Sequence, residues 1–149
     1  FFISETPLWI SFLSFFCIQL QGTLYNYYYV ILRHKSVGGD STSKIFEYKS
    51  PTALPGEKQR NVDILFRIYT IVYGLFDKII HALDRNAYKV KTFPNWFMTA
   101  ISIYGLGFQL LLIAIMLPLN LIEYILPFFI IFTVFLFAFI AIRKRYIKA

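Results

Sequence analysis

LIEYILPFFIIFTVFLFAFIAIRKR is the sequence of residues 121–145, and it decides the fold class of this protein. No charged residue lies between Glu123 and Arg143. A helix needs about 20 predominantly apolar residues to cross the hydrocarbon core of a bilayer, so the stretch predicts a transmembrane helix over residues 121–142. Pro127 removes one backbone donor from that helix and predicts a kink in it.

The composition excludes an ordinary soluble domain. Of the 149 residues, 58% are hydrophobic, 20% are aromatic and only 15% are charged, whereas about a quarter of the residues of a soluble domain are charged. The length is that of a single domain. The net charge of +7 arises from basic residues beside apolar segments, so we expect contacts with membrane lipids and no nucleic acid. The single cysteine, Cys17, excludes an internal disulfide.

Two further uncharged stretches predict two further transmembrane helices. They precede Arg33 and Glu123, and we place the helices over residues 7–32 and 94–117. A proline and an asparagine within residues 118–120 predict a tight turn, so the last two helices should be antiparallel neighbours. The apolar residues show no heptad seam, and the expected fold is an all-α integral membrane domain.

The distribution of basic residues predicts how the helices are oriented. Lys and Arg are absent from residues 1–6 and 118–123 but are concentrated at the opposite helix ends. The positive-inside rule therefore places the N-terminal end outside, and it places a polar loop at residues 36–60 and a basic tail at residues 143–149 in the cytoplasm. The basic residues behind this prediction are Arg33, Lys35, Lys44, Lys49, Lys58, Arg60, Arg85, Lys89, Lys91, Arg143, Lys144, Arg145 and Lys148.

Residues 61–85 predict an amphipathic helix and not a span. Polar residues recur there at spacings of four and three, which gives a narrow polar stripe on an otherwise apolar helix. Because both flanks are predicted to be cytoplasmic, we expect this helix to lie at the membrane surface. A solvated face is the favoured interpretation of the stripe, and the lining of a functional site is the alternative. The stripe contains Asp63, Arg67, Thr70, Gly74, Asp77, His81 and Asp84, and the apolar face contains Ile64, Ile68, Ile71, Leu75 and Ile79.

Residues 19–35 combine amide, tyrosine and basic side chains. Gln21 and Asn26 are costly in hydrocarbon and should face the bundle interior or a polar cavity. Arg33 and Lys35 follow a group of tyrosines and are available to a phosphate group. The alternative is that the amides hold helices together and the tyrosines form an interfacial belt.

Other motifs favour structural roles. Gly105 and Gly107 predict the close approach of a neighbouring helix. Residues 38–44 are rich in Gly, Ser and Thr but lack the spacing of a nucleotide-binding loop. No set of His, Cys, Asp and Glu has the spacing of metal ligands.

Three motifs in the first third of the chain occur in a recognisable order. They are Gln21-Gly22-x2-Tyr25-x-Tyr27-Tyr28, then Arg33, and then Gly38-Gly39-Asp40-x-Thr42-Ser43. Together they resemble the later part of bacterial CDP-alcohol phosphatidyltransferases, and the resemblance extends through the amphipathic segment and the closing helical pair. Members of that family have six spanning helices and cytoplasmic termini. The resemblance therefore implies the last three helices of a six-helix bundle in a bacterial inner membrane, with a cytoplasmic C-terminus.

The same resemblance implies an activity, although not a catalytic residue. The family transfers a phosphatidyl or related phosphoalcohol group from a CDP-alcohol to an acceptor alcohol and releases CMP. Its motif Asp-x2-Asp-Gly-x2-Ala-Arg-x8-Gly-x3-Asp-x3-Asp binds a divalent metal ion, Mg or Mn, and this motif is absent here. This chain alone is therefore expected to be inactive. Arg33, Lys35 and Arg67 are the candidates to bind a substrate phosphate, and Gln21 and Asn26 are the candidates to line a polar cavity.

The chain begins at Phe1 without a methionine, so we expect it to be a piece of a longer protein. Two other functions stay open, namely a small non-enzymatic membrane subunit and half of a transporter. A transporter half should contain a broken helix and an ion site near the bilayer midplane. A homodimer is a further option for any of these.

Overall fold

The structure is a computed structural model, and it describes residues 7–36 and 49–147. Within these two ranges every regular element is a helix and there is no strand. The loop at residues 38–44 lies outside the described residues, as do residues 1–6 and Lys148. The helices are α1 (Leu8–Ser36), α2 (Gln59–Val72), α3 (Gly74–Leu83), α4 (Asn95–Ile101), α5 (Leu106–Met116), α6 (Ile122–Phe132) and α7 (Val134–Tyr146), with short 3-10 helices η1 (Ala87–Lys89) and η2 (Ser102–Tyr104).

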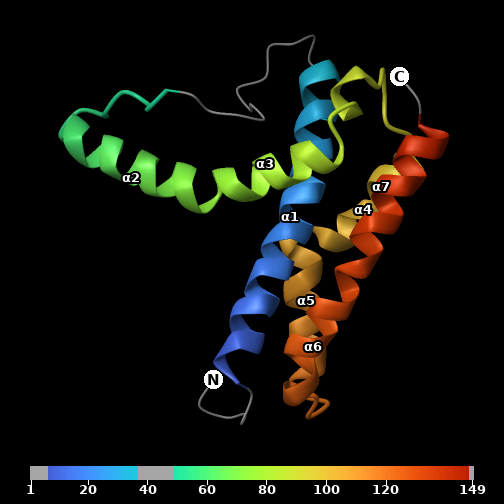
Figure 1. Cartoon of the computed structure of the whole chain (residues 1–149). Helices are drawn as coiled ribbons and strands as arrows, with labels where there is room; N and C mark the ends of the chain where they lie inside the picture. Colours follow the sequence, from blue (N-terminus) through green and yellow to red (C-terminus); the bar gives the residue numbers. More distant parts are fainter. Residues whose placement is uncertain (1–6, 37–48, 148–149) are drawn as a thin grey trace.

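Two helical stretches are long and apolar enough to cross a membrane, namely α1 and the pair α6–α7. A third stretch consists of two halves, α4–η2 and α5, with a bend of 50° between them. It is long enough to cross a membrane only if the two halves are taken as one span. In Figure 1 the three stretches run along one another, while α2 and α3 lie across them. The predicted all-helical class is confirmed, with two stretches of span length, and a third only if the bent pair is one span, where the sequence predicts three.

One face of α1 provides the centre of the packing. Six buried residues recur at spacings of three and four, which is a single face of a helix, and Tyr27 and Val30 beside it are buried as well. This face packs against α6 and α3, and residues such as Leu24, Tyr28, Phe97 and Tyr104 form the core between the helices. Because several of its positions are polar or small, the heptad seam is not visible in the apolar residues alone. The face consists of Ser14, Cys17, Gln21, Leu24, Tyr28 and Ile31.

The last span is interrupted at Thr133, between α6 and α7, while Pro127 lies inside α6. The Leu136 N–H donates to the Thr133 carbonyl at 3.0 Å, a three-residue spacing that is tighter than in an α-helix. At the same place the Tyr104 hydroxyl of η2 donates to the Phe132 carbonyl at 3.0 Å. The interruption therefore exposes a backbone acceptor that the bent span satisfies.

The turn between α5 and α6 has the geometry that residues 118–120 predict. Asn120 adopts a left-handed backbone with φ of 57°. Its N–H donates to the Leu117 carbonyl at 3.1 Å, and the Leu121 N–H donates to the Met116 carbonyl at 3.0 Å. This is a Schellman arrangement, in which asparagine is the common substitute for glycine. The turn makes α5 and α6 antiparallel neighbours (Figure 1).

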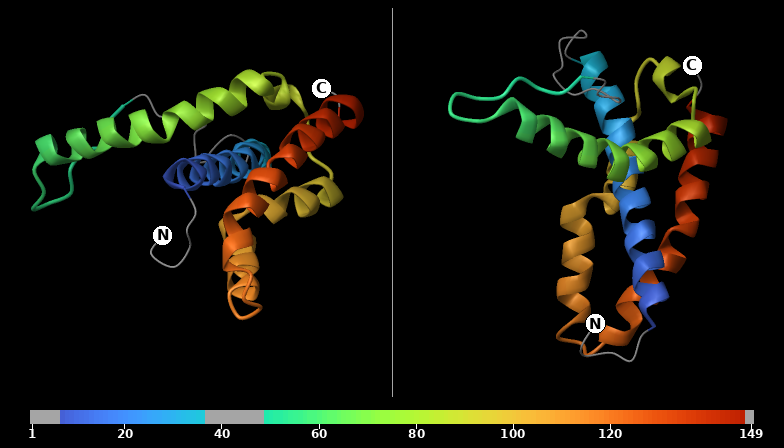
Figure 2. Two further views of the ribbon diagram at one scale, coloured as in Figure 1. Left: turned by 60° about the horizontal axis from the view of Figure 1, so that its bottom comes forward. Right: turned by 60° about the vertical axis from the view of Figure 1, so that its left-hand side comes forward.

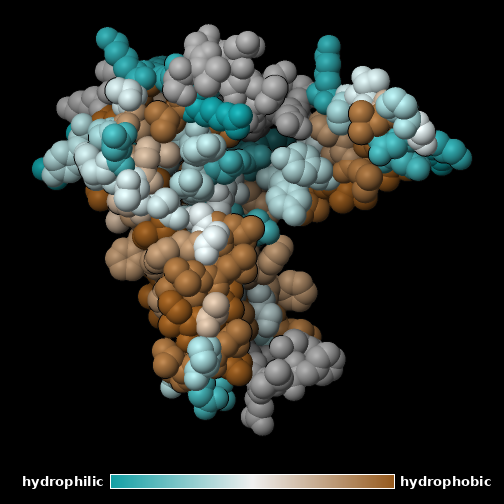
Figure 3. All heavy atoms as spheres, turned by 180° about the vertical axis from the view of Figure 1, so that it is seen from behind, coloured by the Kyte–Doolittle hydropathy of each residue, from teal (hydrophilic) through white to brown (hydrophobic). Residues whose placement is uncertain are grey.

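The amphipathic segment predicted over residues 61–85 consists of two helices, α2 and α3, that meet at Tyr73. Figure 2 shows α3 crossing α1 and α2 extending beyond the bundle as an arm. No residue of α2 is buried. In Figure 3 apolar residues gather on the side of the arm that continues into the apolar body. The large apolar side chains exposed on α2 are Ile64, Leu65, Ile68, Tyr69, Ile71 and Val72.

Two helices extend further than the sequence predicts. The first was expected to end at residue 32 but continues to Ser36, and the last was expected to end at residue 142 but continues to Tyr146. Basic side chains occupy the last turn of both, where they interact favourably with the helix dipole and do not stop the helix. The basic residues at the start of the expected tail therefore belong to α7.

Candidate functional site

Two buried charges lie where α3 and α7 end. Asp84 is the C-cap residue of α3, and it is 0% exposed. Arg143 lies in the last turn of α7 and is 4% exposed. A buried ion is costly unless it is paired and hydrogen-bonded, so each of these side chains requires a partner.

The two charges satisfy one another, and α1 completes the cluster. The guanidinium of Arg143 forms an ion pair with Oδ1 of Asp84, and its Nε donates to Oδ2 at 2.5 Å. The Tyr28 hydroxyl of α1 donates to the same Oδ2 at 2.7 Å. Side chains from α1, from the end of α3 and from α7 thus meet at one carboxylate. These bonds offset the desolvation of the pair.

A second tyrosine fixes the backbone of the same turn. The Tyr27 hydroxyl donates to the Asp84 backbone carbonyl at 3.1 Å and lies 3.2 Å from Nδ1 of His81. The Tyr28 ring packs on Phe93 and Phe97, with ring centroids 5.3 and 5.5 Å away. The end of α3 at Asp84 is therefore held against α1.

A hollow of about 580 Å³ lies over this cluster. Its lining comes from the loop after α3, from η1 and from the last turn of α7. Arg85, Lys89 and Lys144 line it and are exposed, while Asp84 and Arg143 lie at its base. Because the base pair neutralises itself, the three exposed cations give the hollow its charge, and an anion is the ligand that it suits.

The three residues predicted to bind phosphate lie in different places. Lys35 is half-buried at the end of α1, and its ammonium donates to the Val90 carbonyl, directly after η1. Arg33 is exposed two residues earlier on α1. Arg67 is exposed on α2, in the arm that extends away from the bundle. Lys35 thus lies beside the segment that lines the basic hollow, whereas Arg67 lies on a separate element.

The two residues predicted to line a polar cavity face different directions. Gln21 is 0% exposed, and its Nε2 donates to the Phe129 carbonyl at 2.9 Å and to the Thr133 hydroxyl at 2.7 Å. Gln109 of α5 donates to Oε1 of Gln21 at 3.1 Å. Gln21 therefore links α1 to α5 and α6 through hydrogen bonds, which agrees with the alternative interpretation that the amides hold helices together. Asn26 is exposed on another face of α1.

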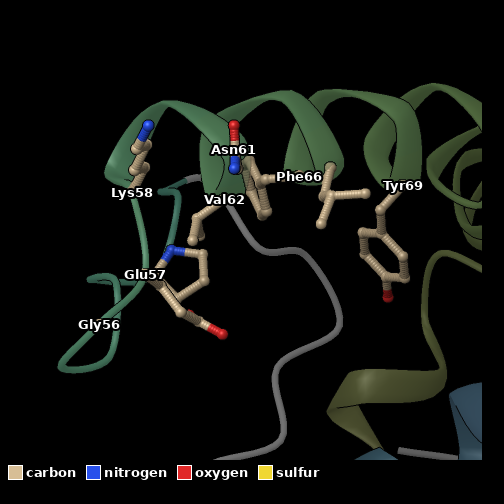
Figure 4. Close-up of a pocket in the computed structure, with 9 residues that line it drawn as sticks. Gly56, Glu57, Lys58, Asn61, Val62, Phe66 and Tyr69 are labelled. Carbon is tan, nitrogen blue, oxygen red and sulfur yellow. The ribbon is translucent and has the colours of Figure 1, made fainter.

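A second hollow lies under the arm and has a different character. It measures about 830 Å³ between α2 and the segment before it. In Figure 4 Val62 and Tyr69 project from the same side of α2, the side on which Gly56 and Glu57 lie. Leu65 and Phe66 add further apolar surface. The cations do not converge here as they do in the basic hollow, so we place the candidate site at the latter.

The divalent metal ion implied by the resemblance finds no ligand set here. Among the described residues, no group of three or more His, Cys, Asp and Glu side chains could hold a metal ion. The most buried carboxylate, Asp84, is already engaged by Arg143 and Tyr28. The described residues of this chain therefore do not fit the ion.

Sequence reasoning missed the Asp84–Arg143 pair, although a signal was present. Phe129, Leu136, Ile140 and Arg143 are buried at spacings of seven, four and three, so the arginine continues the apolar face of α6–α7. Its basic neighbours Lys144 and Arg145 are exposed and do not continue that face. Asp84 was assigned to a stripe favoured as a solvated face, and at this end of the stripe that interpretation is wrong because the residue is buried.

Comparison with known proteins adds no assignment. No protein-family model, no curated protein and no solved structure matches this chain.

Proposed function

We propose that this chain is the C-terminal part of a membrane transferase that moves a phosphatidyl or related phosphoalcohol group from a CDP-alcohol to an acceptor alcohol and releases CMP. The observation that carries the proposal is the position of Lys35. Its ammonium is held against the backbone after η1, at the end of an otherwise apolar bundle where basic residues from α1, the α3–η1 loop and α7 gather. The basic end of the bundle should attract a phosphate group, which carries one or two negative charges.

The helix arrangement supports the topology that goes with this function. We propose three crossings, α1, α4–α5 and α6–α7, as the last three of a six-helix bundle in a bacterial inner membrane. The positive-inside rule then places the basic end and the C-terminus in the cytoplasm. Large side chains such as Trp9, Phe12, Leu110 and Phe137 are exposed along the bundle, and this surface suits lipid or the remaining helices.

In this proposal the candidate residues have separate roles. Arg33 and Lys35 pair with a substrate phosphate at the cytoplasmic end, and Arg67 approaches from the arm. Gln21 fixes the distance between helices, and the exposed Asn26 is the candidate to line a polar cavity. The Mg or Mn ion would be held by the family's aspartate motif, which this chain lacks, and it would supply charge neutralisation for the pyrophosphate.

The test uses the full-length protein, purified in detergent with magnesium or manganese. CMP release from CDP-diacylglycerol is measured for the natural protein and for variants Arg33→Ala and Lys35→Ala, with Arg60→Ala as the control from an exposed position on α2. Since a charge-assisted hydrogen bond contributes about 1.5–3 kcal/mol, each site variant should weaken binding of the CDP-lipid roughly ten- to a hundredfold. A full-length sequence without the aspartate motif would exclude the enzyme. Full activity in both site variants would exclude this phosphate site.

One observation favours a second candidate function, half of a transporter. The stretch α4–η2 and α5 is bent by 50° at Gly105, and a discontinuous helix is typical of transporter binding sites. A transporter should also contain an ion site near the bilayer midplane. Among the described residues, no cluster of acidic and histidine side chains could form one. Solute uptake into proteoliposomes, measured beside CMP release on one preparation, distinguishes the two functions.

A further inference from the structure

The basic hollow after α3 is separate from the predicted phosphate residues Arg33, Lys35 and Arg67, none of which lines it. Its lining includes three basic residues, Arg85, Lys89 and Lys144, together with Asn86. All four side chains are exposed. In the described part of the chain no ion pair involves any of the three cations, so their charge is available to a ligand.

The carboxylate at the base of the hollow does not repel an anion, because it is paired. Asp84 is the negative group nearest in sequence, but its carboxylate is engaged by Arg143 and by the Tyr28 hydroxyl. The buried pair therefore contributes little net charge, and it holds the loop and α7 at a fixed separation. A ligand that enters here meets three positive charges.

Two of the three cations have an exposed tyrosine close to them in the chain. Tyr88 is 52% exposed and adjoins Lys89, whose ammonium is 5.8 Å from the centroid of its ring. Tyr146 is 69% exposed in the same last turn of α7 as Lys144, and Trp96 is 55% exposed at the start of α4. Exposed tyrosine and tryptophan are typical of the headgroup level of a bilayer, which is also the level of lipid phosphates.

We propose that this hollow binds the phosphate of an anionic lipid headgroup from the surrounding leaflet. The two ammonium groups and the guanidinium contact the phosphate oxygens, the Asn86 amide offers a further donor, and the acyl chains extend along the apolar surface of the bundle. A lipid suits the site better than free phosphate because the exposed rings of Tyr88, which adjoins Lys89, and Tyr146, two residues after Lys144, offer apolar contacts that free phosphate cannot use. The proposed phosphate residues Arg33, Lys35 and Arg67 do not line this site, and lipid binding there needs neither a CDP-alcohol nor a metal ion.

The test measures binding and not catalysis. The full-length protein in a neutral detergent is titrated with dihexanoyl phosphatidylglycerol, with inorganic phosphate and with dihexanoyl phosphatidylcholine. We expect saturable binding of the anionic lipid that weakens as salt is added, and binding of the other two probes at least tenfold weaker. Equal affinity for inorganic phosphate would show an anion site that is not a lipid site and would overturn the proposal, as would equal affinity for the zwitterionic lipid.

Three sets of substitutions locate the site. The triple variant R85Q/K89Q/K144Q should lose at least tenfold in affinity for the anionic lipid, since charged hydrogen bonds are removed. The variant R85K/K89R/K144R keeps the charges and should retain most of the affinity. The control K49Q/K58Q/R60Q removes the same charge from exposed positions before and at the start of α2. Equal losses in the triple variant and the control would mean that net charge alone attracts the lipid, and the site would be rejected.

Discussion

The carboxylate of Asp84 and the guanidinium of Arg143, 59 residues apart in the chain, form an ion pair whose side chains are 0% and 5% exposed. The pair joins the end of the amphipathic segment to the end of the last span. Tyr28 adds α1 to the same carboxylate. A single buried cluster therefore fixes the relative position of the elements that form the basic hollow.

Breaking this pair should destabilise the protein strongly. Arg143→Met leaves the buried Asp84 carboxylate without its counter-ion, and loss of one partner of a buried pair costs about 3–5 kcal/mol. The free energy of unfolding is measured by detergent-denaturant titration. Arg145→Met, an exposed change next to it in the same turn, should cost less than about 0.5 kcal/mol.

The double variant separates a charge effect from a packing effect. Asp84→Asn combined with Arg143→Met removes both charges, so it should be more stable than Arg143→Met alone. Equal stability of the single and the double variant would mean that lost packing, and not an unpaired carboxylate, explains the result.

The helical class followed from the sequence because uncharged stretches of span length have few other interpretations. The packing was harder to predict. Ser14, Cys17 and Gln21 occupy buried positions of α1 but are polar or small, so hydropathy does not distinguish them from the lipid-facing side. The bend at Gly105 was not predicted either, because an apolar run from residue 94 to residue 117 has the composition of a continuous helix.

The amide network should contribute measurably to stability. Gln21→Leu removes the bonds to Phe129, Thr133 and Gln109 within the apolar bundle. Hydrogen bonds between helices in membranes contribute about 0.6 kcal/mol on average, so loss of this network should cost roughly 1–2 kcal/mol by the same titration. Asn26→Leu, at an exposed position of the same helix, should cost much less. Equal costs would show that both amides have buried partners in the complete bundle.

The arm formed by α2 should lie in the membrane surface. Ile68 is 54% exposed on the apolar side of the helix, and Thr70 is on the opposite side, where its hydroxyl bonds only the Phe66 carbonyl of its own helix. Fluorescent probes attached to single cysteines at these positions report depth in proteoliposomes. Lipid-borne quenchers should reach the probe at position 68, and aqueous quenchers should reach the probe at position 70. Equal quenching of both probes by acyl-chain quenchers would indicate a buried span.

The stability of the start of the arm should depend on pH through Asp63. Hydrogen bonds from Ser50 and then Gln59 to its carboxylate lower the pKa of Asp63 below the usual range of an aspartate. A carboxyl group whose pKa is lower in the folded state stabilises that state above its unfolded pKa, near 4, and this contribution is lost as the pH falls through the folded value. Amide exchange of residues 50–63 should therefore accelerate in acid. Asp63→Asn should remove this dependence, and an unchanged profile in that variant would assign the effect to another group.

The site residues show where sequence reasoning stops. Arg33 and Lys35 could be chosen because basic residues after a tyrosine-rich helix end suggest an interface. Arg85, Lys89 and Lys144 could not be grouped in advance, because they belong to two segments that meet only when Asp84 pairs with Arg143. An ion pair between distant parts of the chain leaves no local pattern, and only the buried spacing of Arg143 on its helix pointed to it.

The two glycines of the predicted close approach should respond differently to alanine. A Cβ at Gly105 would lie 3.0 Å from the Ser102 carbonyl oxygen and 3.6 Å from the Tyr25 ring of α1, whereas a Cβ at Gly107 would meet nothing within 4 Å. Gly105→Ala should therefore force the bend or α1 to shift and cost about 1–3 kcal/mol of unfolding free energy. Gly107→Ala lies inside α5 and should be neutral or stabilising by up to about 1 kcal/mol, because alanine favours the helix. A larger loss at position 107 than at position 105 would mean that another part of the protein packs on α5 and that the bend tolerates a side chain.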